Sequence, residues 1–136
     1  MKHLDFISID PGVKYFAYAC VRKGELVSCG LTQDKRCLYS RFPFPFVIVE
    51  TQKIHRGGEK KKKAVTDLAR AAGEIMGQFP DGVYWPLSQL PKKVFQARAY
   101  AALTPPERLL VDIHKKTDQH HILDAIGFAM KYLGRK

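Results

Sequence analysis

Three carboxylates and one histidine have the residue types and spacing to support chemistry in this chain. Asp10 and Glu50 each follow an apolar run. Asp124 follows His121 by three residues, so these two side chains would share one face of a helix. Carboxylates that converge from separate elements can hold two Mg²⁺ ions about 4 Å apart. One ion would activate water and the other would stabilise the leaving oxygen, which are the needs of phosphodiester hydrolysis.

Each acidic position also has an ordinary structural interpretation. An acid at a strand end, such as Glu50, commonly only begins a solvated loop, and Asp10-Pro11-Gly12 is also a plain turn sequence. Asp124 is harder to explain in this way, because apolar residues flank it on both sides and predict a place near the core. A nearly buried carboxylate needs a partner, and a metal ion is one such partner.

Apolar runs predict the strands that would position these residues. Strands are expected over 4–10, 15–21, 26–31 and 46–49, the last as a central strand buried on both faces. The short link Lys23-Gly24-Glu25 predicts an antiparallel hairpin between the second and third. A polar, proline-containing loop is expected over 33–45, and a further short strand over 83–87.

Helical spacing predicts the remaining elements. One helix would start at Lys61 and end at Pro80-Asp81-Gly82, and another would cover 91–102. Thr104-Pro105-Pro106-Glu107 predicts a helix start with a capping box. The last helix would cover 118–133, with Asp118 as its N-cap. This order predicts an α/β fold with a mixed sheet, in a single domain over residues 1–136.

Composition limits the class of partner and compartment. The chain has 23 Lys plus Arg against 13 Asp plus Glu, a formal charge of +10, which predicts attraction to polyanions such as nucleic acid. A basic surface that only aids solubility is the alternative. The N-terminal residues lack the apolar stretch of a signal peptide, and no apolar run reaches the ~18 residues of a membrane span. Three cysteines without a CxxC pair indicate neither a disulfide framework nor a zinc knuckle, so a soluble, cytoplasmic protein is expected.

Four segments resemble the motifs of the RuvC-type Holliday junction resolvases, a family of the RNase H-like superfamily. Ile7-Ser8-Ile9-Asp10-Pro11-Gly12 resembles the opening motif, and Val47-Ile48-Val49-Glu50 resembles the second, a hydrophobic strand ending in Glu. Residues 63–75 resemble the small-residue helix that follows. The segment from His121 to Ala129 resembles the terminal helix motif, whose usual form is Asp-x-x-Asp-Ala. The order and spacing match over nearly the whole chain.

The resemblance implies an RNase H-like fold, with a five-stranded mixed sheet flanked by helices on both sides. It implies a homodimer that cuts symmetric strands of a four-way DNA junction and leaves 5′-phosphate and 3′-hydroxyl ends. It also implies Mg²⁺ or Mn²⁺, two ions per site, with Asp10, Glu50 and Asp124 as metal-binding carboxylates and His121 at the fourth position. The chain is shorter than typical bacterial members, which suggests a compact, phage-type member acting in a bacterial or phage-infected cell.

Two positions depart from the family pattern. His121 stands where many members have Asp; a neutral imidazole binds Mg²⁺ less well than a carboxylate does and binds Mn²⁺ better. It could also act as a general acid or base, or be only a surface histidine beside His120. Asp118 is a fallback fourth acid. Members often place an aromatic wedge shortly after the second-motif Glu, whereas this loop offers Ile54.

Basic residues near Glu50 and in a later segment are the expected DNA contacts. Cations at a helix start oppose the helix dipole, and the exposed N–H groups there favour phosphate, so a nearby anionic ligand is expected. A solvated charge run is the structural alternative. The predicted contacts are Lys53, Arg56, Lys60, Lys61, Lys62, Lys63, Lys92 and Lys93.

Three functions are therefore compatible with the sequence. The first is a junction-resolving DNA endonuclease. The second is an RNase H-like nuclease acting on RNA or on other branched DNA, and the third is a nucleic-acid-binding module that keeps the fold without the chemistry. Three intact carboxylates in the family's order favour the catalytic hypotheses.

Overall fold

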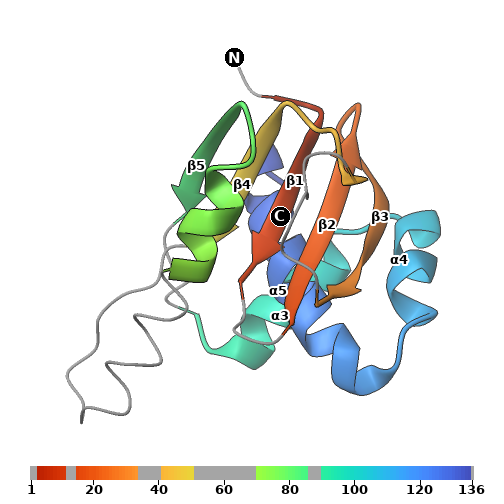
Figure 1. Ribbon diagram of the computed structural model, residues 1–136. Coiled ribbons are helices and arrows are strands. Elements are labelled where there is room, and N and C mark those ends of the chain that lie inside the picture. Colours follow the sequence, from red (N-terminus) through yellow and green to blue (C-terminus); the bar gives the residue numbers. More distant parts are fainter. Residues whose placement is uncertain (1–2, 12–14, 34–40, 51–69, 86–89, 136) are drawn as a thin grey trace, which may run out of the picture.

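The computed structural model of the chain describes residues 3–11, 15–33, 41–50, 70–85 and 90–135. Its five strands form one mixed sheet in the order β3-β2-β1-β4-β5 (Figure 1). The strands are β1 (Phe6–Asp10), β2 (Phe16–Arg22), β3 (Glu25–Thr32), β4 (Phe46–Glu50) and β5 (Asp81–Trp85). β1, β2 and β3 pair antiparallel, whereas β4 lies parallel to both β1 and β5. The predicted five-stranded mixed sheet is therefore confirmed.

The hairpin between β2 and β3 turns through residues with left-handed backbone geometry. Lys23 has a φ of 52° and Gly24 a φ of 77°. Positive φ at both central residues characterises the type I′ turn, whose twist matches that of paired strands. The Asp5 carboxylate accepts a hydrogen bond from the Lys23 backbone N–H at 2.8 Å, which helps to hold this turn.

Helices cover both faces of the sheet. The helices are α3 (Lys92–Ala101), α4 (Pro105–Asp112) and α5 (Lys116–Leu133), together with a helical segment over 70–76. In Figure 1, α5 and α3 lie behind the sheet and the 70–76 segment lies in front of it. Because none of the described helices is both long and apolar enough, none could cross a membrane.

Two hydrophobic cores follow from the alternation of side chains along the strands. Phe6 and Ile48 belong to the core on the α3–α5 side, where they join Ile126. Ile7 and Val47, the adjacent residues in the same strands, belong to the core of the opposite face, which includes the 70–76 segment. All five residues of β4 are buried, which confirms the prediction of a central strand covered on both faces.

Two predicted boundaries are wrong. Asp81 and Gly82 do not end a helix: the helical segment ends at residue 76, and both residues begin β5 by pairing with β4. At Gly82 a side chain would collide with Met76 and Val47, so glycine permits the close approach of β5 to the sheet. Asp118 is not an N-cap either, because α5 starts earlier with Lys115 in that position. Asp118 lies in the first turn, where its charge suits the helix dipole.

The predicted capping box at the start of α4 is confirmed. Thr104 Oγ1 accepts from the Glu107 N–H at 3.5 Å, and Glu107 Oε1 accepts from the Thr104 N–H at 2.8 Å. The same carboxylate also accepts from the Leu26 N–H of β3 at 2.7 Å and pairs with Arg135 at 2.6 Å. Glu107 therefore joins α4 to β3 and to the segment after α5, beyond its capping role.

Candidate active site

Two of the predicted acids meet at one edge of the sheet. β1 and β4 are parallel neighbours, with Ile9 opposite Val49, so Asp10 and Glu50 follow at adjacent strand ends. The carboxyl group of Glu50 is close enough to hydrogen-bond with that of Asp10. Burial raises the pKa of Asp10 well above its ordinary value, and the hydrogen bond and negative charge of Glu50 raise it further. The ends of β1 and β4 thus bring acidic groups together at a position with limited access to solvent.

Helix α5 brings the other two predicted residues to the same edge. Asp10, His121 and Asp124 each offer one ligand atom, and these atoms all lie within 4.8 Å of one another. The buried Ser8 hydroxyl donates to the Ala125 carbonyl at 2.8 Å, which fixes α5 against β1 one residue from Asp124. The three side chains therefore converge because this hydrogen bond fixes the position of α5 relative to β1.

Asp124 is held by neighbours on α3. Only 9% of the residue is exposed, and Gln96 Nε2 donates to its Oδ1 at 3.1 Å. Burial raises the pKa of Asp124, and the Gln96 hydrogen bond and the positive charge of Lys92 oppose that rise. Gln96 was not among the residues predicted from the sequence, because no local pattern marks a glutamine whose partner lies 28 positions further along the chain.

The donor set fits a divalent cation. The carboxyl groups of Glu50 and Asp124 both act on that of Asp10, and their negative charges raise its pKa. A cation bound among these carboxylates would offset their mutual repulsion and would lower the pKa of Asp10. Carboxylate oxygens with one imidazole suit Mg²⁺ and Mn²⁺.

The predicted site residues divide into three groups by their position. Asp10, His121 and Asp124 form one cluster, and Glu50 joins it through its hydrogen bond to Asp10. Lys92 and Lys93 are exposed in the first turn of α3, close enough to the site for Lys92 to influence Asp124. The remaining predicted positions lie outside the described residues; these are Lys53, Ile54, Arg56, Lys60, Lys61, Lys62 and Lys63.

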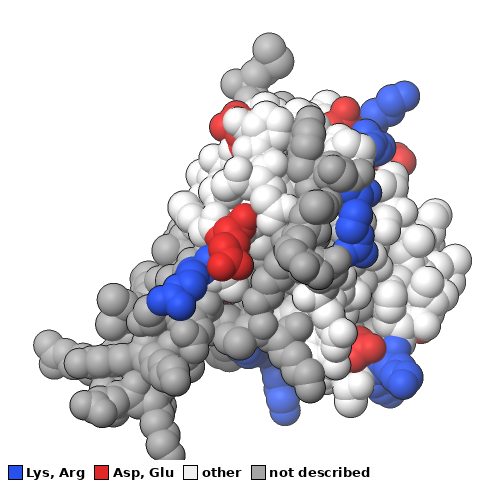
Figure 2. Space-filling view, viewed as in Figure 1, with Lys and Arg blue, Asp and Glu red and all other residues white. Residues whose placement is uncertain are grey.

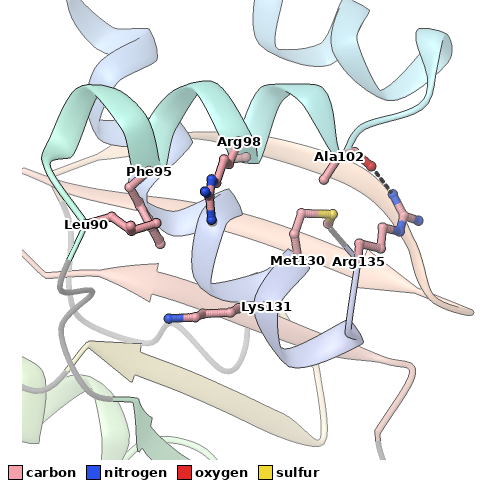
Figure 3. Close-up of a pocket in the computed structure, with 9 residues that line it drawn as sticks. Leu90, Phe95, Arg98, Ala102, Met130, Lys131 and Arg135 are labelled. Atoms are coloured by element: carbon pink, nitrogen blue, oxygen red, sulfur yellow. Dashed lines mark hydrogen bonds between the residues drawn. The ribbon is translucent and has the colours of Figure 1, made fainter.

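A cavity of about 430 Å³ lies between α3 and α5, further along these helices from the cluster. Figure 3 shows Phe95 and Met130 on its walls, with the charged ends of Arg98 and Lys131 on opposite sides of it. Arg135 also lines the cavity, but its guanidinium donates to the Ala102 carbonyl and pairs with Glu107. No carboxylate is among the described lining residues, so the cavity has apolar walls and a cationic rim.

Comparisons with known proteins identify the fold. No protein-family model matches the chain, and no curated protein matches its sequence. Among solved structures, RuvC of T. thermophilus in complex with a Holliday junction substrate matches with a TM-score of 0.57 at 14% identity, over 97% of this chain and 95% of that chain. The yeast mitochondrial Holliday junction resolvase Ydc2 matches with a TM-score of 0.56 at 13% identity, over 98% of this chain and 82% of that chain. The chain therefore has the RNase H-like α/β fold of these two resolvases, as its motifs predicted.

Proposed function

We propose that this chain is a metal-dependent endonuclease that resolves four-way (Holliday) DNA junctions. The observation that carries the proposal is the cluster of Asp10, His121 and Asp124, whose ligand atoms lie within 4.8 Å of one another. Glu50, hydrogen-bonded to Asp10, adds a third carboxylate. The cluster stands in a fold shared with two proteins that are described as junction-bound or junction-resolving.

Asp10, Glu50, Asp124 and His121 would hold Mg²⁺ or Mn²⁺, two ions per site. When bound, the ions supply Lewis acidity for the attacking water and for the leaving oxygen. Water would attack phosphorus, the bond from phosphorus to the 3′ oxygen would break, and that oxygen would leave with a proton as the 3′-hydroxyl. In the alternative role, in which His121 is not a metal ligand, its exposed imidazole would take the proton from water or supply one to the leaving oxygen.

Basic side chains would bind the DNA backbone around this cluster. In Figure 2 the coloured Lys and Arg side chains lie in several separate groups rather than in one patch. On the helical side, Lys92 and Lys93 begin α3, and Arg98 and Lys131 face each other across the cavity. These contacts, together with the predicted ones over 53–63, would set affinity and salt dependence and not sequence preference.

A homodimer would supply the two sites that symmetric cutting of a junction requires. Leu109 on α4 is 64% exposed and Ile113, the C-cap of that helix, is 78% exposed, which is unusual for large apolar side chains. We therefore propose α4 as the dimer interface.

Sedimentation velocity would test the proposed dimer separately. The wild type should sediment as a dimer, and Leu109→Glu combined with Ile113→Glu should shift it to monomer, because charges would be buried without partners. Val94→Glu, which changes an exposed apolar residue of α3, should leave the dimer intact. A monomeric wild type would rule out this assembly.

Cleavage of defined substrates tests the proposed function. A labelled synthetic four-way junction would be incubated with Mg²⁺ and with Mn²⁺, beside duplex, flap and RNA–DNA hybrid controls. We expect paired, symmetric cuts in the junction alone. Cutting of the hybrid but not of the junction would favour a nuclease acting on RNA, and binding without any cutting would leave a non-catalytic binding module.

A further inference from the structure

We propose that Gln96 on α3 is a positioning residue that orients the carboxylate of Asp124 for metal binding, an inference that rests on the proposed function. Its side chain contacts α5 at three points. Nε2 lies 3.1 Å from Asp124 Oδ1 and 3.1 Å from the His120 carbonyl, and Oε1 lies 3.2 Å from His120 Nδ1. One amide group thus joins the carboxylate to the helix turn that precedes it.

The three contacts fix which end of the amide faces the carboxylate. Asp124 Oδ1 and the His120 carbonyl are both acceptors, so the group between them must be the NH₂ donor. The reverse orientation would oppose oxygen to oxygen at two contacts. Oε1 then accepts from the Nδ1–H of His120.

The backbone that carries Gln96 is anchored in the core. Its neighbour Phe95 is buried and lies 5.3 Å from Phe128 between ring centroids. Gly127 permits this close approach of α3 to α5, because a side chain there would collide with the Phe95 ring. Gln96 therefore reaches Asp124 from a fixed position, which a residue on an exposed loop would not do.

A hydrogen bond to one oxygen limits rotation of the Asp124 carboxylate. The carboxylate keeps further lone pairs for a cation, and its preferred orientation is set before the cation arrives. Residues that orient metal ligands in this way commonly alter metal affinity by about 10–100-fold when they are changed. Loss of the Gln96 amide should therefore weaken metal binding without removing a ligand.

The test compares Gln96→Met with Gln119→Met. Methionine keeps the length of the side chain and suits a helix, but it has no donor. Gln119 also donates from a side-chain amide, to the His114 carbonyl at 2.8 Å, so its variant loses a comparable bond that does not involve the cluster. Mn²⁺ affinity would be measured by electron paramagnetic resonance titration of the metal-free protein.

We expect Gln96→Met to bind Mn²⁺ about 10–100-fold more weakly than the wild type does. Junction cleavage should need correspondingly more Mn²⁺ and recover at saturation, while junction affinity without metal stays unchanged. Gln119→Met should bind Mn²⁺ as the wild type does. In an Asp124→Asn background, Gln96→Met should have little further effect, because its partner carboxylate is already gone.

Two other results would count against the inference, and they differ in what they reject. Equal Mn²⁺ affinity in Gln96→Met and the wild type would overturn the positioning role while leaving the metal centre intact. Absence of Mn²⁺ binding by the wild type would overturn the metal centre itself, and the role of Gln96 with it.

Discussion

Asp10 and Glu50 bring two carboxyl groups close together, and these groups repel each other once both are charged. Burial and the neighbouring acids hold the pKa of Asp10 well above its ordinary value, so the charged form of Asp10 costs folding free energy. An ionisable residue that lowers the stability of the fold in this way is typical of a functional site. The order of Asp10, Glu50 and Asp124 along the chain was visible in the sequence, but the raised pKa of Asp10 was not.

Asp10→Asn should abolish cutting while leaving junction binding intact. The amide keeps the size of the side chain but is a poorer ligand for a hard cation, so we expect the cleavage rate to fall by more than the roughly 10–100-fold of an indirect change. Gel-shift and single-turnover assays would measure the two properties separately. Undiminished cutting by this variant would remove Asp10 from the site.

The same variant should make the metal-free protein more stable at neutral pH. A raised pKa in the folded state means that stability falls as pH rises from the ordinary value of 3.8 through the folded-state value. Asparagine removes that loss, so the stability difference between variant and wild type should vanish below pH 3.8. Urea unfolding at several pH values without metal would measure it.

His121→Asp should change metal preference rather than abolish activity. An imidazole favours Mn²⁺ relative to Mg²⁺, and a carboxylate in its place favours the harder cation. We expect the ratio of cleavage rates in Mn²⁺ and Mg²⁺ to fall by about tenfold, equivalent to ~1.4 kcal/mol. His3→Asp adds the same charge before β1, at the end of that strand opposite Asp10, and should leave the ratio unchanged. An unaltered ratio in His121→Asp would remove His121 from the metal ligands.

At the scale of elements, the sequence predicted those helices, strands and turns that depend on interactions between nearby residues. The apolar strands, the hairpin between β2 and β3 and the capping box at Thr104 all follow from residues close together in the sequence. The start of β5 was missed, because Asp81-Gly82 is a turn sequence locally and becomes a strand only by pairing with β4. Gln96 was missed for a similar reason: its function depends on how α3 crosses α5, which no periodicity in α3 encodes.

Glu107→Gln tests how strongly α4 is tied to the sheet. Burial alone would raise the pKa of Glu107, but hydrogen bonds from Arg135, Thr104 and Leu26 lower it from 4.5 to about 2. At 1.36 kcal/mol per pKa unit, the folded protein gains about 3 kcal/mol from the charged carboxylate. Because the folded-state pKa is lowered, this gain is complete above pH 4.5 and is lost as pH falls towards 2.

Urea unfolding at pH 7 and at several values below pH 4.5 would measure this loss. Glu107→Gln should be less stable by about 3 kcal/mol at pH 7 and should approach the wild type near pH 2. Glu25→Gln, at the exposed start of β3, should change stability by less than about 0.5 kcal/mol. A pH-independent difference for Glu107→Gln would mean that packing rather than charge accounts for its contribution.

At the scale of the whole molecule, the chain has a formal net charge of +10, whereas its candidate active site is acidic. On α5, Asp124 belongs to the cluster, and Lys131 follows it by seven residues, about 10 Å along the helix axis. Lys131 and Arg98 line the cavity, whose described lining contains no carboxylate. A DNA strand whose scissile phosphate lies at the cluster could therefore continue along the α3–α5 face, with about three nucleotides covering this length at ~3.4 Å each.

Arg98→Ala and Lys131→Ala should each weaken junction binding and reduce its dependence on salt. Each lost phosphate contact lowers the slope of log affinity against log salt by about 1 in magnitude. Arg22→Ala removes a cation from the end of β2 that lies beside the start of β1, far from Asp10, and should leave the slope unchanged. If the two cavity variants retain the wild-type slope, the strand does not pass the cavity, and the contacts predicted at Lys92, at Lys93 and over 53–63 would have to account for the slope.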